Sequence, residues 1–147
     1  YNCPSQIVIS GKKEGVSECK EKLASRGAKC IDLPVSGAFH SPLMNSASEG
    51  LANFISELSF NDARYPIVLN RQASPETQKN NLKENIALQV NSSVLWTKTI
   101  QYFESKNIDT LIEVGPGKVL SGLAKKTCSI NTVSINSAES LQEFCKN

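Results

Sequence analysis

Short apolar segments alternate with longer stretches of helical spacing along this chain, and this alternation restricts the fold more than any other feature. The apolar segments lie at residues 6–10, 29–33, 66–70, 110–114 and 131–135. Stretches with the spacing of helices lie at residues 12–25, 46–58, 80–90, 93–106, 118–126 and 140–146. Strands that alternate with helices predict an α/β fold with a mainly parallel sheet and flanking helices.

The pattern also predicts how these elements are covered and where they end. At residues 46–58 apolar side chains recur three and four positions apart, so one helix face packs inward. The apolar run at residues 66–70 is short and continuous, as in a strand covered on both faces, and we expect residues 110–114 to form a buried strand as well. We further expect Gly27 to end the first helix and Ser92 or Ser93 to cap the helix at residues 93–106.

Composition excludes several classes of function. The chain has 147 residues, of which 39% are hydrophobic and 20% charged, and its net charge is +2. These values indicate a globular domain of ordinary size, with neither the basic patches of a nucleic-acid-binding protein nor an apolar run that spans a membrane. The 5 cysteines are scattered, lack C-x-x-C spacing and have a single histidine beside them, so we expect no metal site and a reducing compartment.

The only histidine, His40, lies in a loop between a predicted strand and a predicted helix. Residues 35–44 read V-S-G-A-F-H-S-P-L-M. An imidazole is the side chain best suited to general base catalysis at neutral pH, although a lone loop histidine is more often simply solvated. No nucleophile accompanies it, because the G-x-S-x-G motif is absent and no cysteine has the surroundings of a known nucleophile.

Three further polar residues are candidates, each with a structural alternative. Gln89 lies near the end of a predicted helix, where it is either a surface residue or part of the environment that orients the imidazole. Asn70 ends a predicted strand at the edge where α/β sheets place ligands, and a capping role is equally open. Asn2 precedes a Cys-Pro pair and is either a turn residue or a substrate contact. We interpret Gly115-Pro116-Gly117 as a tight strand-to-helix turn, since it lacks the pattern of a phosphate-binding loop.

Four ordered motifs make the chain resemble the C-terminal half of malonyl-CoA:acyl carrier protein transacylases and related acyltransferase domains. Residues 2–11, N-C-P-S-Q-I-V-I-S-G, are similar to the family pattern N-S-P-x-Q-x-V-I-(S/A)-G. Residues 33–44 resemble its catalytic histidine segment, and residues 89–96 its Q-x-x-x-P-V-x-W segment with Ser92-Ser93 in place of Asn-Pro. Residues 113–120, E-V-G-P-G-K-V-L, match E-x-G-P-G-x-V-L.

This resemblance implies acyl transfer through a serine ester, in which malonyl passes from coenzyme A to the phosphopantetheine thiol of acyl carrier protein. His40 is then the base, and the backbone carbonyl of Gln89 is the expected partner of its Nδ1 atom. Phe39 and Asn2 are the substrate-binding residues that the resemblance implies, with Phe39 favouring malonyl over methylmalonyl because its ring leaves no room for an α-methyl group. Asn70 is a further candidate for substrate binding, from its place at the end of a predicted strand. No cofactor is expected beyond the coenzyme A thioester substrate.

The resemblance also implies a division of the chain and a missing part. Residues 1–35 would end a small ferredoxin-like subdomain, and residues 36–147 would form the C-terminal part of the α/β-hydrolase-like subdomain with its parallel sheet. The serine nucleophile, the oxyanion hole and the arginine for the malonyl carboxylate would lie in an N-terminal half absent from this sequence, so we expect a fragment that is inactive alone. The expected partners are malonyl-CoA and acyl carrier protein, without nucleic acid or membrane, in the cytoplasm or an organelle stroma. Two alternatives stay open, a polyketide synthase acyltransferase and a non-catalytic module that docks acyl carrier protein.

Overall fold

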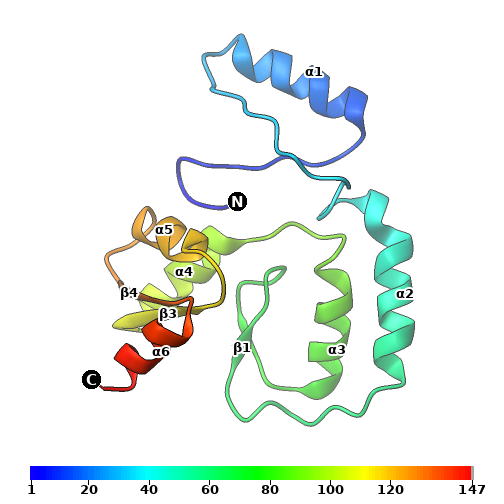
Figure 1. The fold of residues 1–147 in the computed structure, drawn as a ribbon. Helices are drawn as coiled ribbons and strands as arrows, with labels where there is room; N and C mark the ends of the chain where they lie inside the picture. Colours follow the sequence, from blue (N-terminus) through cyan, green and yellow to red (C-terminus); the bar gives the residue numbers. More distant parts are fainter. Residues whose placement is uncertain (147) are drawn as a thin grey trace. The chain divides into compact units, whose positions relative to one another are not determined.

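Helices and short strands alternate along the chain in the computed structural model, which describes residues 1–146 (Figure 1). Their order is α1 (Lys13–Ala24), the 3-10 helix η1 (Pro42–Met44), α2 (Asn45–Ser56), β1 (Ile67–Val68), β2 (Pro75–Glu76), α3 (Lys79–Leu88), α4 (Trp96–Ser105), β3 (Thr110–Val114), α5 (Val119–Lys125), β4 (Asn131–Ile135) and α6 (Ala138–Phe144). The α/β class predicted from the sequence is therefore confirmed. The elements belong to two compact units, one of residues Val8–Val94 and one of Tyr1–Ile7 with the residues from Leu95 onward.

In the unit Val8–Val94, α2 packs against α3. Ile55 of α2 and Leu82 of α3 are each 4% exposed and form the apolar part of this interface. The buried Ser48 adds a directed contact, since its hydroxyl donates to the carbonyl of Ala87 at 2.8 Å. The two-residue strands β1 and β2 pair antiparallel as a hairpin that precedes α3.

Gly27 ends α1 as the sequence predicted. Its φ of 85° lies in the left-handed region, which glycine adopts without steric cost. The Gly27 N–H donates to the Ala24 carbonyl at 2.9 Å, and the Ala28 N–H donates to the Leu23 carbonyl at 3.0 Å. These bonds satisfy carbonyl groups that the helix leaves free at its end.

The other unit contains a parallel pair of strands. β3 and β4 run side by side in register from Thr110 opposite Asn131 to Val114 opposite Ile135. α5 packs against both strands and α6 packs against β4. Ile100 of α4 is fully buried in this unit.

A carboxylate joins the end of β3 to the start of α5. The two oxygens of Glu113 accept hydrogen bonds from the backbone N–H groups of Leu120 and Ser121, each at 2.9 Å. The intervening turn needs its glycines, because Gly115 and Gly117 have φ values of 139° and 90°. Hydrogen bonds from Ser121, and then from the Leu120 amide, hold the pKa of Glu113 below its ordinary value.

Two predicted strands are wrong. Residues 6–10 form only an isolated bridge between Cys3 and Gln6, and residues 29–33 have no regular structure. A strand requires a neighbouring strand for its backbone hydrogen bonds, and apart from the bridge at Gln6 neither segment has one among residues 1–146. The periodicity of a sequence shows which residues suit a strand, without showing whether a partner is present.

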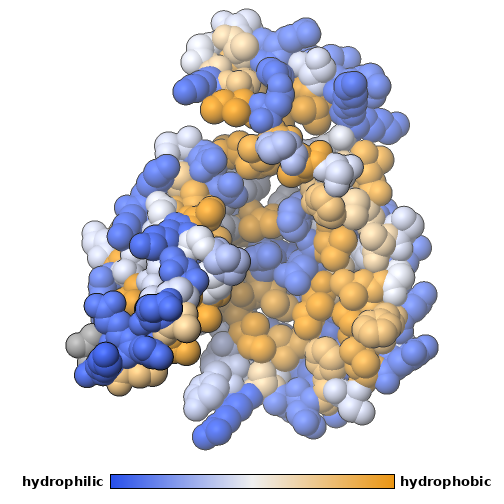
Figure 2. All heavy atoms as spheres, viewed as in Figure 1, coloured by the Kyte–Doolittle hydropathy of each residue, from blue (hydrophilic) through white to orange (hydrophobic). Residues whose placement is uncertain are grey.

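The prediction of a mainly parallel sheet holds only for β3 and β4, because β1 pairs antiparallel with β2, which lies outside the predicted strands. The expected burial of the apolar runs is also wrong, since Ile112 is 47% exposed and Val114 is 77% exposed. In the part of the chain that the structure describes, no helix covers that face of β3 closely enough to bury them. Figure 2 shows other hydrophobic side chains open at the surface.

The predicted cap of α4 is wrong as well. The helix begins at Trp96 with Leu95 at the N-cap position, and no side chain there accepts a hydrogen bond. Ser92 and Ser93 lie too far upstream, because residues 93–95 have no regular structure and separate them from the helix. No helix among the described residues is both long and apolar enough to cross a membrane.

Replacement of Glu113 by glutamine should destabilise the fold in a pH-dependent way. The folded pKa lies below the ordinary value of 4.5, so the stabilisation is fully present above that pH and is lost as the pH falls through the folded pKa. Glu113→Gln should lower the melting temperature by a few degrees at pH 7, and the difference from wild type should shrink toward pH 3. The control is Glu104→Gln, which removes one exposed charge from α4. An equal difference at both pH values would contradict this role of the carboxylate.

Candidate functional site

The loop that carries His40 has a defined backbone. His40 itself is exposed and has a φ of 61°, in the left-handed region that few residues other than glycine adopt. The buried Ser41 follows, and its hydroxyl donates to the Ala38 carbonyl at 2.7 Å and accepts from the Leu43 N–H at 3.3 Å. Ser41 thereby caps η1, which begins at Pro42. Its two hydrogen bonds hold the backbone of the loop on both sides of His40.

The end of α3 holds His40 through two hydrogen bonds. The helix ends at Leu88, and the carbonyls beyond it have no partner within the helix. The His40 N–H donates to the Val90 carbonyl at 3.0 Å. The His40 Nδ1 atom lies 2.9 Å from the Gln89 carbonyl oxygen, the contact that the sequence resemblance implied.

This second contact determines which nitrogen of the neutral imidazole carries the proton. A carbonyl oxygen can only accept, so the hydrogen bond requires the proton on Nδ1. The Nε2 atom then keeps its lone pair, as a general base requires. The geometry therefore gives the one histidine of the chain the tautomer of a base.

Phe39 lies directly before His40 and is 48% exposed. Its ring packs over Gly37, where a Cβ atom would lie 3.2 Å from the ring atom Cε2. Any larger residue at position 37 would press on the ring. Gly37 is thus a residue that supports the site and that the sequence did not single out for this purpose.

Asn70 lies in the turn of the β1–β2 hairpin and is half-buried. Its neighbour Arg71 donates from Nη1 to the Asn85 side-chain oxygen at 2.8 Å, which ties the hairpin to α3. Among the described residues no hydrogen bond joins Asn70 to His40, so its role toward substrate stays a prediction.

Asn2 belongs to the other compact unit. Its N–H donates to the Gln6 carbonyl at 3.1 Å, within a tight turn around Pro4 and Ser5. This contact agrees with the structural alternative for Asn2, and its contact with substrate stays a prediction.

Comparison with known proteins gives the family. A family model described as "Acyl transferase domain" matches residues 1–145. The chain belongs to this acyl transferase family.

Named relatives agree with that family. The malonyl CoA-acyl carrier protein transacylase of Staphylococcus aureus strain COL is 40% identical over 99% of this chain and 48% of its own length. The crystal structure of the malonyl CoA-acyl carrier protein transacylase from Clostridium perfringens matches with a TM-score of 0.93 and 31% identity, over 99% of this chain and 46% of that one. A malonyl-transacylase solved in complex with a type II polyketide synthase acyl-carrier protein matches with a TM-score of 0.86 and 29% identity, over 93% and 45% of the two chains. This acyl transferase chain thus spans about half the length of the relatives it matches.

Two buried polar residues near the acyl transferase histidine escaped the sequence analysis. Ser48 and Asn85, 4% and 2% exposed, join α3 to α2 and to the β1–β2 hairpin. Ser48 lies three residues before Leu51, and Asn85 lies three residues after Leu82. Each therefore occupies a position on the apolar side of its helix. A polar residue within an apolar stripe is the sequence signal that would have found them.

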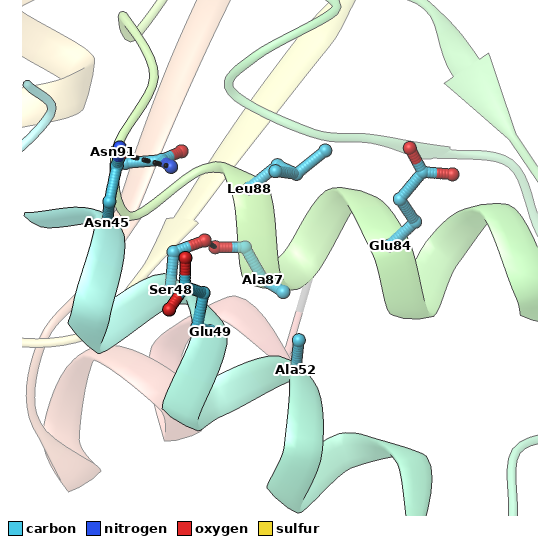
Figure 3. Close-up of a pocket in the computed structure, with 8 residues that line it drawn as sticks. All are labelled: Asn45, Ser48, Glu49, Ala52, Glu84, Ala87, Leu88 and Asn91. Carbon is cyan, nitrogen blue, oxygen red and sulfur yellow. Dashed lines mark hydrogen bonds between the residues drawn. The ribbon is translucent and has the colours of Figure 1, made fainter. Parts of the chain in front are cut away.

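An open groove of about 360 Å³ lies between α2 and α3. Figure 3 shows that Ser48 and Ala87 line it, with the carboxylates of Glu49 and Glu84 at its sides. No group of three or more His, Cys, Asp or Glu side chains among residues 1–146 is arranged to hold a metal ion.

The tautomer of His40 can be measured directly, because it is the only histidine. At a pH where the imidazole is neutral, ¹⁵N NMR of histidine-labelled protein should show Nδ1 protonated and Nε2 unprotonated, since Nδ1 faces the Gln89 carbonyl. The same spectrum in concentrated urea serves as the control. A folded-state spectrum dominated by the Nε2–H form would contradict the assignment.

Proposed function

We propose that this chain provides the histidine base of a malonyl-CoA:acyl carrier protein transacylase in fatty acid synthesis. The observation that carries the proposal is the hydrogen bond from His40 Nδ1 to the Gln89 carbonyl, within a chain that matches the acyl transferase family over nearly its whole length. The printed names of the Staphylococcus aureus and Clostridium perfringens relatives support malonyl-CoA as donor and acyl carrier protein as acceptor.

In the first half-reaction, His40 Nε2 takes the proton of a serine hydroxyl as the serine oxygen attacks the thioester carbonyl of malonyl-CoA. The carbon–sulfur bond then breaks, and the coenzyme A thiolate leaves with the proton that His40 returns. The product is a malonyl ester of the serine. In the second half-reaction the phosphopantetheine thiol gives its proton to Nε2 and attacks the ester, and the serine recovers its proton.

The Gln89 carbonyl takes the place that a carboxylate occupies in a Ser-His-Asp triad. It orients the ring and interacts favourably with the imidazolium that forms when Nε2 is protonated. A neutral acceptor stabilises that cation less than a carboxylate would. The fixed backbone position at the end of α3 compensates in part, because the carbonyl needs no reorganisation during the reaction.

The serine must come from another part of the enzyme. The sequence contains no G-x-S-x-G motif and spans about half of its relatives, so we propose that an N-terminal half carries the serine and the arginine for the malonyl carboxylate. No bound cofactor is needed beyond the coenzyme A thioester, and the reaction would take place in the cytoplasm or an organelle stroma.

A polyketide synthase acyltransferase is the second candidate function. The matched complex of a malonyl-transacylase with a type II polyketide synthase carrier supports it. The two candidates share the chemistry at His40 and differ in the acyl carrier protein that receives the malonyl group. Comparison of transfer rates to a fatty acid carrier and to a polyketide carrier distinguishes them.

Malonyl transfer should require both His40 and the serine-bearing half. The 147-residue chain alone should give no radiolabelled malonyl-acyl carrier protein, and the chain with a segment that carries the serine should give it. In that assembly, His40→Asn should reduce turnover by about 10³-fold or more, because no base remains. Asparagine tolerates the left-handed φ of position 40, so this variant should keep the fold. Serine-dependent loading by the chain alone, or unchanged turnover of the folded His40→Asn variant, would contradict the proposal.

Phe39 should set the selectivity for the acyl group. Phe39→Ser removes the ring beside the base and should raise the ratio of kcat/KM for methylmalonyl-CoA over malonyl-CoA by about tenfold or more, the usual worth of one methyl group in a pocket. Phe54→Ser is the matched control, since Phe54 is also exposed but lies on α2. An unchanged ratio in Phe39→Ser, or an equal change in Phe54→Ser, would show that Phe39 does not set the selectivity for the acyl group.

A further inference from the structure

The loop that begins at His40 is fastened to the end of α3 at both of its ends. At one end His40 bonds to the carbonyls of Gln89 and Val90. At the other end the Asn91 side chain donates from Nδ2 to the Asn45 side-chain oxygen at 3.0 Å, a contact that Figure 3 shows at the end of the groove between α2 and α3. Residues 40–45 and 89–91 are therefore joined by three hydrogen bonds.

The contact of a third residue agrees with the direction of the bond between the two asparagines. The Ser92 hydroxyl donates to the Asn91 side-chain oxygen at 3.2 Å. With its oxygen accepting from Ser92, Asn91 turns its Nδ2 group toward the Asn45 oxygen, which accepts.

The orientation of the Gln89 carbonyl depends on what holds residues 89–91, because these residues lie beyond α3. Their amides are bound, Gln89 N–H to the Asn85 carbonyl at 3.0 Å and Val90 N–H to the Ala87 carbonyl at 3.4 Å. The Val90 N–H belongs to the same peptide as the Gln89 carbonyl, and its bond to Ala87 is long, so it holds that peptide only weakly. The side chain of Asn91 is the contact that anchors this segment at its far end to α2.

The backbone of His40 gives a second reason for such an anchor. A non-glycine residue with a φ of 61° persists where its surroundings hold it there. The bond between Asn45 and Asn91 holds residue 45, at the far end of the same short loop, against the same segment that binds His40.

We propose that Asn45 and Asn91 are a positioning pair for His40. Their hydrogen bond keeps the Gln89 carbonyl on Nδ1, and through it keeps Nε2 unprotonated and free. The pair touches neither substrate nor the reacting atoms, and its catalytic importance rests on the proposed function of His40 as the base.

Two variants of Asn45 separate the hydrogen bond from other effects of changing this residue. Asn45→Asp keeps an oxygen that accepts from Asn91 Nδ2, and Asn45→Leu has nearly the same size without an acceptor. By ¹⁵N NMR, Asn45→Asp should keep the wild-type ratio of the Nδ1–H to the Nε2–H form of His40, and Asn45→Leu should lower that ratio about fivefold, as expected for the loss of one hydrogen bond.

Equal changes in the two Asn45 variants, or no change in either, would overturn the proposal. Should Asn45→Leu fail to fold, Asn45→Ala and Asn91→Ala provide the same test. Each should lower the tautomer ratio alike, and the double variant should lower it no further, because both remove one bond. Additive effects in the double variant would also overturn the pairing.

The tautomer is read from the chain itself and does not depend on malonyl transfer. In the assembled enzyme, Asn45→Leu should reduce kcat about tenfold with little change in KM, since a misdirected base impairs chemistry rather than binding. If the wild-type assembly transferred no malonyl group, the proposed function would be contradicted. The tautomer measurement would still test the pairing of Asn45 and Asn91. An altered tautomer with unchanged kcat would overturn the catalytic importance of the pair.

Discussion

The free carbonyl groups at the end of α3 are the constraint on which the arrangement of the site depends. A helix leaves its last carbonyls without partners, and in a folded chain these groups need donors. Here the donors are the backbone N–H and the imidazole Nδ1–H of one residue, His40. The same two hydrogen bonds satisfy the carbonyls of the helix terminus and orient the imidazole that we propose as the base.

α3 is placed by directed polar contacts as much as by apolar burial. Its sequence, K-N-N-L-K-E-N-I-A-L, offers few apolar residues. Asn85 accepts from Arg71 and donates to the Asn81 carbonyl, and Ser48 of α2 donates to Ala87. A buried polar group has a much narrower range of favourable positions than a methyl group, because an unmade hydrogen bond is costly. Such contacts suit a helix whose end must hold an imidazole at one angle.

Local structure could be predicted from the sequence wherever the residues that determine a helix or strand lie within that same element. The bounds of β3 and β4 agree with the predicted runs, and the helices around Leu51 and Leu82 are present because their apolar faces are visible in the spacing. The segments at residues 6–10 and 29–33 failed because a strand depends on a distant neighbour. The His40–Gln89 contact was available from family resemblance, since residues 49 positions apart give no local signal of their proximity. Asn45 and Asn91 could not be found at all, because surface asparagines next to turns are common.

The turn after β3 has a consequence for the binding of anions. In many α/β proteins a glycine-rich turn between a strand and a helix presents free amides to phosphate groups. In this chain the amides of Leu120 and Ser121 already bind the carboxylate of Glu113. The helix start that most resembles a phosphate-binding site is occupied by the protein's own anion. An anion from outside would have to displace this carboxylate before it could bind to the same two amides.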